Sequence, residues 1–152
     1  MMLRHGQTLA AFAALLALSS PTYAALGGDV SSVSKDQARL KATVRVSSGE
    51  RFSLHELVAA TGTKVREYAG TDGRVFGVAW QGPWRPDLRQ LLGDYFDDYR
   101  QAARKKRTGL NGPLTSASSR LVIEMSGHPR AFYGRAYVPD LLPPGVQAAE
   151  VR

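Results

Sequence analysis

Histidine is the side chain whose charge changes most readily near neutral pH, and it is a common zinc ligand. The sequence contains His5, His55 and His128. The pair His55-Glu56 begins as a zinc-binding H-E-x-x-H helix does, but Ala59 stands where the second histidine is needed. Because no ligand spacing supports a metal site, the sequence predicts neither a bound metal nor a cofactor.

Carboxylates are the other candidates for acid–base chemistry. Asp94, Asp97 and Asp98 lie within about one turn of a predicted helix, and paired carboxylates can act as general acid and base when burial separates their pKa values. Here they lie off the apolar stripe of that helix, which favours a solvated acidic face. Serine motifs of hydrolases such as G-x-S-x-G are absent from the sequence. The sequence therefore names no catalytic residue and favours a non-enzymatic protein.

Two clusters indicate binding instead. One is a run of basic residues at the end of the same helix, and the other joins an aromatic and a basic residue in the connection before it. Clustered cations attract anionic surfaces, and exposed aromatic side chains beside arginine are typical of recognition surfaces. Complementation of the helix dipole would also explain the first cluster, and packing over the helix start would also explain the second. The predicted binding surface consists of Trp84, Arg85, Arg100, Arg104, Lys105, Lys106 and Arg107.

One long amphipathic helix is the most regular element that the sequence predicts. Its apolar residues recur at 3.6-residue spacing over about 86–105. Asp87 near its start and the basic residues at its end both suit the helix dipole. Gly93 interrupts this pattern, which indicates a close crossing with another element.

Before the helix, alternating apolar residues over 43–81 predict an antiparallel meander of strands. Asp72 and Gly73 mark a hairpin turn in it, because glycine accepts the positive φ that a tight turn demands. On the strand after this turn, the large residues predicted to share the core face are Phe76, Val78 and Trp80.

After the helix, residues 108–119 are predicted to form an exposed loop because they are rich in Gly, Ser and Thr. Two strands follow over 120–126 and 130–138, and the second buries either Phe132 or Tyr133. The whole pattern predicts an α+β domain in which an antiparallel meander sheet of about five strands packs against the long helix.

The first 24 residues are typical of a secretory signal peptide. Arg4 lies in a short polar start, residues 9–18 form an apolar run, and small residues precede a predicted cleavage after Ala24. An uncleaved membrane anchor is the alternative, but ten residues at about 1.5 Å each reach only half of a roughly 30 Å hydrocarbon layer. We therefore expect the protein to be exported.

Net charge and cysteine content limit the classes of protein to which the chain can belong. The full chain has 152 residues, a formal net charge of +7 and no cysteine. Loss of residues 1–24 removes one arginine, so 19 basic and 13 acidic residues leave a charge of +6. Without cysteine, a disulfide scaffold, a thiolate nucleophile and a lipidated N-terminus are excluded.

The predicted organisation has four parts. They are a signal peptide over 1–24, an exposed segment with a short helix over 25–42, a single α+β domain over 43–146 and a tail over 147–152. Ser34 is the expected cap of the short helix.

Several motifs occur in the order of a known bacterial family. They are Arg66-Glu67-Tyr68, VFGVAWQGP over 75–83, PDLRQLLGDYF over 86–96 and RAFYGRAY over 130–137. In these motifs the chain resembles the family called domain of unknown function 2844, over nearly the whole predicted mature chain. The resemblance implies an exported proteobacterial protein, favours the periplasm over the medium, and carries over no catalytic residue.

Together these observations predict a small exported module that binds another component of the cell envelope, either a protein or an anionic component. Nucleic acid is disfavoured as a partner because the chain is exported, and no transmembrane anchor is expected after cleavage. Two alternatives stay open: a hydrolase of an envelope polymer that uses carboxylates unpaired in the sequence, and an inhibitor or chaperone-like factor that presents a sheet edge or loop.

Overall fold

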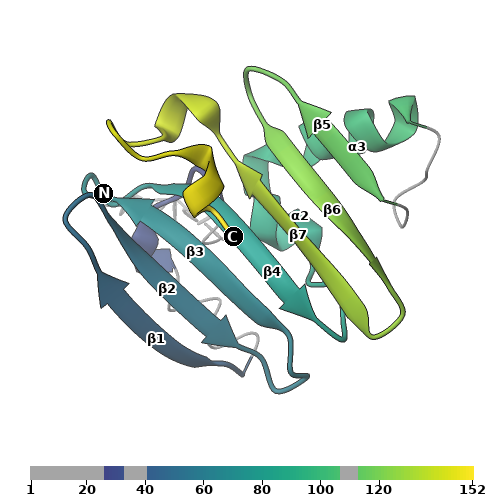
Figure 1. Ribbon diagram of the computed structural model, residues 1–152, viewed down its shortest axis with the longest axis horizontal. Coiled ribbons are helices and arrows are strands. Elements are labelled where there is room, and N and C mark those ends of the chain that lie inside the picture. The colour runs from purple at the N-terminus through teal and green to yellow at the C-terminus, as the bar shows by residue number, and fades with distance from the viewer. Residues whose placement is uncertain (1–25, 33–40, 107–112) are drawn as a thin grey trace, which may run out of the picture.

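The computed structural model describes residues 26–32, 41–106 and 113–152. Its central element is a seven-stranded antiparallel sheet with the strand order β1-β2-β3-β4-β7-β6-β5 (Figure 1). The strands are β1 (Thr43–Ser48), β2 (Phe52–Val58), β3 (Lys64–Gly70), β4 (Val75–Gly82), β5 (Leu114–Ala117), β6 (Val122–His128) and β7 (Ala131–Tyr137). The predicted α+β class with an antiparallel sheet is confirmed, whereas the predicted number of about five strands is wrong.

The strand that sequence patterns missed is β5, which falls inside the predicted loop 108–119. Its sequence, LTSA, has a single large apolar residue, Leu114, so it carries no alternation that identifies a strand. Pairing with β6 places Leu114 opposite Met125 and satisfies the backbone groups on one side of this short edge strand. A tertiary contact therefore forms this strand where local propensity favours a loop.

A helical layer covers one face of the sheet and lies behind the strands in Figure 1. It comprises α2 (Leu88–Leu92), the 3-10 turn η2 (Gly93–Tyr95) and α3 (Phe96–Lys105). The helix predicted over 86–105 is thus interrupted at Gly93, whose φ of 50° is not helical and whose N–H donates to the carbonyl of Arg89. Asp87 caps α2 by accepting hydrogen bonds from the backbone N–H groups of Arg89 and Gln90.

The main core lies between this helical layer and the sheet. Leu92 of α2 and Tyr99 and Ala103 of α3 are buried against strand residues that include Trp80 and Ile123. The apolar stripe predicted for the helical segment therefore faces the sheet, and its burial supplies the main apolar stabilisation of the fold.

The described part of the N-terminal segment also joins this core. Leu26 is 2% exposed, and its N–H donates to the carbonyl of Leu91 at 3.1 Å. The 3-10 turn η1 (Val30–Ser32) follows. The predicted exposure of 25–42 is wrong at Leu26, because α2 engages both its side chain and its backbone. The predicted signal peptide and the predicted helix cap at Ser34 lie outside the described residues.

A β-bulge in β4 changes the predicted faces of that strand. Phe76 is an extra residue there, because Tyr68 pairs with Gly77 and the next pair is shifted by one. Phe76 therefore packs on the face away from the helices, whereas Val78 and Trp80 lie in the core beneath them. The prediction that grouped all three residues on one face is wrong, since alternation is lost at the bulge.

The face of the sheet away from the helices, here called the outer face, is partly covered by the C-terminal segment, residues 138–152 (Figure 1). This segment contains the 3-10 turns η3 (Pro139–Leu141) and η4 (Ala148–Glu150). Val151 is fully buried on Gly77, where an added Cβ would lie 2.8 Å from Val151 Cγ2. The predicted tail over 147–152 is therefore wrong, because the sheet leaves a space at Gly77 that Val151 fills.

Candidate functional site

The structure separates the two parts of the binding surface predicted from the sequence. Trp84 and Arg85 follow β4, whereas the basic cluster ends α3, and these two element ends lie far apart in Figure 1. Trp84 is 64% exposed, so it does not pack over the helix start. The guanidinium of Arg85 lies 5.2 Å from the centre of the Phe132 ring. This loop and the basic cluster therefore do not form one surface.

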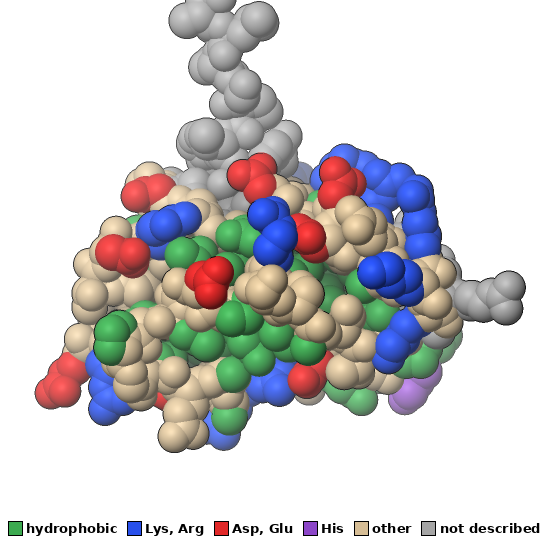
Figure 2. All heavy atoms as spheres, turned by 90° about the horizontal axis from the view of Figure 1, so that it is seen from above, with side chains coloured by type: hydrophobic (Ala, Val, Ile, Leu, Met, Phe, Trp, Pro, Cys, Tyr) green, Lys and Arg blue, Asp and Glu red, His purple; other side chains and the backbone are tan. Residues whose placement is uncertain are grey.

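Within the basic cluster, Arg100 Nη1 lies 3.2 Å from Asp97 Oδ1 one turn earlier in α3. Arg104, Lys105 and Lys106 are exposed at the end of the helix, and Arg107 lies outside the described residues. In the view of Figure 2, Lys and Arg side chains are spread over both sides of the molecule, while apolar side chains occupy its middle. The position of Arg104 and Lys105 in the last turn of α3 is the one that complementation of the helix dipole requires.

The candidate acid–base residues remain apart. His55 Nε2 lies 3.0 Å from Ser53 Oγ, and burial lowers the pKa of His55 below its usual value. His128 is exposed at the end of β6, and Asp98 Oδ2 lies 3.3 Å from Arg120 Nε. Over the described ranges, no group of three or more His, Asp or Glu side chains is placed to hold a metal ion.

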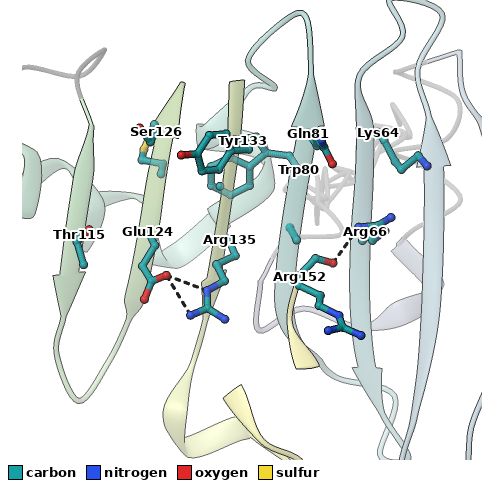
Figure 3. Close-up of a pocket in the computed structure, with 13 residues that line it drawn as sticks. Lys64, Arg66, Trp80, Gln81, Thr115, Glu124, Ser126, Tyr133, Arg135 and Arg152 are labelled. Atoms are coloured by element: carbon teal, nitrogen blue, oxygen red, sulfur yellow. Dashed lines mark hydrogen bonds and ion pairs between the residues drawn. The ribbon is translucent and has the colours of Figure 1, made fainter. Parts of the chain in front are cut away.

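A groove of about 570 Å³ lies on the outer face beside the end of the C-terminal segment (Figure 3). Side chains from β3, β4, β5, β6 and β7 line it. Its charged residues are the cations Lys64, Arg66, Arg135 and Arg152 and the carboxylate Glu124. Its uncharged polar residues are Gln81, Thr115, Ser126 and Tyr133. The groove thus carries more positive than negative side chains, and apolar residues such as Trp80 and Met125 also line it.

Strand register brings the charged residues into one row across the sheet. Ala79 on β4 pairs with Arg66 on β3 and with Arg135 on β7. Arg135 in turn pairs with Glu124 on β6, and Arg66 pairs with Glu56 on β2. Because Ala79 has a small side chain, the groove is deeper at this position than at the arginines on either side.

Arg135 is fixed from two sides. Its Nε and Nη2 atoms both lie 3.0 Å from Glu124 Oε2. Its Nη1 atom donates to the carbonyls of Ala148 and Val151 at 3.2 Å each. Because charge-assisted hydrogen bonds of this kind are directional, they hold both the guanidinium and the C-terminal segment in place.

Arg66 repeats this arrangement on the other side of Ala79. Its Nε donates to Glu56 Oε2 at 2.9 Å, and its Nη1 donates to the backbone oxygen of Arg152 at 3.0 Å. The hydrogen bond from Arg66 lowers the pKa of Glu56, helped by the charges of Lys64 and Arg66. Arg66 and Arg135 therefore both donate hydrogen bonds to backbone oxygens of the C-terminal segment. Each arginine also pairs with a glutamate carboxylate.

Other groups of the groove remain open to a ligand. Tyr133 is 56% exposed and Phe132 is partly buried, so Phe132 is the more buried of these two alternatives. Lys64 Nζ reaches Glu56 only at 3.6 Å. Among the residues that the structure describes, the guanidinium of Arg152 makes no ion pair within 4.0 Å.

None of these groove residues was predicted from the sequence to belong to a binding site. A signal was present, because Lys64, Arg66 and Tyr68 alternate on β3 and Tyr133 and Arg135 alternate on β7. Polar residues at period two mark a strand face that is turned away from the core. Their meeting depends on β4 lying beside β7, which the order of strands along the chain does not reveal.

The fold and the groove define a small α+β protein whose sheet is closed by helices on one face and partly open on the other. The model of the family described as Protein of unknown function (DUF2844) matches residues 22–151. The chain belongs to this family, and the resemblance in its motifs is confirmed. Searches of curated proteins and of solved structures found no match. None of the helices in the described ranges has the length and apolar composition to span a bilayer.

Proposed function

We propose that this protein is an exported, non-enzymatic binding module of the cell envelope, and that the outer-face groove holds an anionic partner. The observation that carries the proposal is the lining of the groove, with four cationic side chains and one carboxylate. A concave surface lined mainly by one sign of charge attracts the opposite charge. Support for export comes from the three-part pattern of residues 1–24.

The arginines of the groove suit this role because they are held before a ligand arrives. Glu124 fixes Arg135 and Glu56 fixes Arg66, so little side-chain freedom is lost on binding. Lys64 and Arg152 stand beside them and add charge. All three nitrogens of Arg135 are bonded within the protein, whereas the Arg152 guanidinium presents several N–H groups in one plane, which match carboxylate and phosphate oxygens.

The binding site is tested by comparing two variants that each lose two positive charges, one in the groove and one at the end of α3. The double variant Lys64→Gln/Arg152→Gln removes two charges from the groove, and Arg104→Gln/Lys105→Gln removes two from the exposed end of α3. Both variants have the same net charge. We expect the groove variant to elute from dextran sulfate resin at clearly lower salt than the helix variant. Equal elution of the two variants would show attraction by overall charge alone and would refute the groove as the site.

Export is tested separately on the full chain expressed in a Gram-negative bacterium. Mass spectrometry of the periplasmic fraction is expected to find a chain that begins at Ala25. An intact Met1, or recovery from the cytosolic fraction alone, would contradict this part of the proposal.

A further inference from the structure

We infer that the ligand of the groove is an acidic oligosaccharide, a short chain of sugars that bear carboxylates. This inference rests on the proposed function and names the ligand class of the same site. It follows from three features of the groove: its floor, its row of uncharged polar side chains, and the arginines beside that row.

At the floor of the groove, a ligand can contact side chains, whereas almost all backbone N–H and C=O groups are already hydrogen-bonded between strands. The strands β3, β4, β7 and β6 are interior strands, each hydrogen-bonded to neighbours on both sides. A peptide that binds through its own backbone adds to a free sheet edge. In the groove lining only Thr115 lies on an edge strand, β5. A ligand of the groove is therefore recognised mainly by side chains, as a ligand rich in hydroxyl groups can be.

One row of side chains matches the uncharged parts of a sugar chain. Gln81 pairs with Lys64 on one side and with Tyr133 on the other, and Tyr133 pairs with Ser126. At a spacing of about 4.8 Å between strands, the row spans about 14 Å. Figure 3 shows these side chains along one line across the sheet. The exposed ring of Tyr133 offers an apolar face, and the Gln81 amide and Ser126 hydroxyl offer donors and acceptors.

The charged row lies parallel to the first, two residues further along each strand and therefore about 7 Å away. Arg66 and Arg135 flank Ala79 there, and the Arg152 side chain extends beside them (Figure 3). A sugar chain that lies along Gln81 and Tyr133 directs substituents on one of its sides towards these guanidinium groups. Carboxylates are the substituents that pair with the Arg152 guanidinium through charge-assisted hydrogen bonds, while the charges of Arg66 and Arg135, whose N–H groups are largely bonded within the protein, add attraction.

The experiment uses the protein purified from the periplasm after expression of the full chain. Oligomers of galacturonic acid are titrated into it by calorimetry, beside their methyl esters, inorganic phosphate and poly-glutamate. We expect the uronate to bind and its methyl ester to bind at least about tenfold more weakly, because esterification removes the charges. Tyr133→Ala should lower the affinity for the uronate by about tenfold or more.

Val46→Ala is the control, because Val46 is a similarly exposed apolar residue on β1, outside the groove lining. It should leave the affinity for the uronate unchanged. Loss of binding in Trp84→Ala with none in Tyr133→Ala would move the site to the loop that follows β4 and overturn the inference.

The remaining outcomes separate the two proposals. If poly-glutamate or phosphate binds as tightly as the uronate and Tyr133→Ala has no effect, the sugar ligand is refuted while the anionic groove stands. If none of these anions binds and the groove charge variant elutes from the resin with the helix variant, both proposals fail.

Discussion

The two faces of the sheet are closed in different ways. The helical layer covers one face through apolar contacts, in which Leu92 and Tyr99 are buried against the strands. The C-terminal segment covers part of the outer face through Val151 and through hydrogen bonds to Arg66 and Arg135. The second closure leaves a groove of about 570 Å³.

This difference shows how one sheet can serve both stability and recognition. Apolar burial scales with area and needs no particular geometry, so it suits the face that stabilises the fold. Directional bonds to guanidinium groups hold a short segment at a few points and leave neighbouring polar groups open. We therefore expect substitutions on the helix face to affect the free energy of unfolding most, and substitutions on the outer face to act locally.

The largest effect is expected for Leu92→Ala on the helix face. Leu92 is fully buried between α2 and the sheet, and its truncation leaves a cavity worth about 3 kcal/mol of stability. Urea unfolding followed by circular dichroism measures the change. Leu54→Ala, at a half-buried position of the outer face, should cost about 1 kcal/mol. Equal losses of unfolding free energy in the two variants would show that the two faces do not differ in their contribution to stability.

A smaller effect is expected where Val151 lies on Gly77. Gly77→Ala places a methyl group 2.8 Å from Val151 Cγ2, and Val151→Ala removes the side chain that fills this space. Each single variant should lose about 2 kcal/mol. The double variant should lose less than the sum, because the new methyl enters the vacated space. Strict additivity in urea unfolding would show that Val151 is not seated on Gly77.

Tyr68→Phe tests the polar attachment of the C-terminal segment. The Tyr68 hydroxyl donates to the backbone oxygen of Arg152 and accepts from its N–H at 3.0 Å. Loss of these bonds should cost about 1 kcal/mol. Limited proteolysis is expected to release the end of the segment faster than in the unmodified protein, with the sheet intact. Unchanged cleavage within residues 146–152 would contradict the attachment.

The smallest effect is expected from Glu56→Gln, and it should depend on pH. The hydrogen bond from Arg66 lowers the folded-state pKa of Glu56 below its ordinary value of 4.5. The resulting stabilisation is present above the unfolded pKa and is lost as pH falls through the folded pKa. Between about pH 6 and about pH 3 the unmodified protein should therefore lose more stability than Glu56→Gln, by less than about 1 kcal/mol.

Thermal unfolding of the two proteins across this pH range measures the difference. His55, whose pKa is lowered by burial, titrates in both proteins and does not contribute to the comparison. Identical pH profiles would show that the ion pair of Glu56 with Arg66 adds nothing to stability.

Elements with a strong local signal were predictable from the sequence. The turn at Asp72 and Gly73 joins β3 to β4 as expected, since Gly73 has a φ of 78°. The apolar stripe of the helical segment predicted which side faces the core. The sequence could not predict β5, because its four residues carry no pattern and pairing with β6 forms it. The bulge at Phe76 likewise has no local signal.

The candidate site was beyond sequence reasoning for a different reason. Its residues come from strands that are far apart in the chain, such as Arg66 on β3 and Arg135 on β7. Their side of the sheet follows from alternation, but their neighbourhood depends on the pairing of β4 with β7. The sequence emphasised contiguous clusters instead, and the binding roles of the Trp84 loop and of the basic cluster at the end of α3 stay predictions.

The position of β7 has a consequence for how the chain acquires its shape. This strand is made last, yet it stands between β4 and β6, with Gly77 opposite Tyr137. A chain whose synthesis stops before Ala131 has two further strand edges with no partner, those of β4 and β6, and such edges promote aggregation. Closure of such distant pairs is slow, so the sheet can be completed only after nearly all residues have emerged.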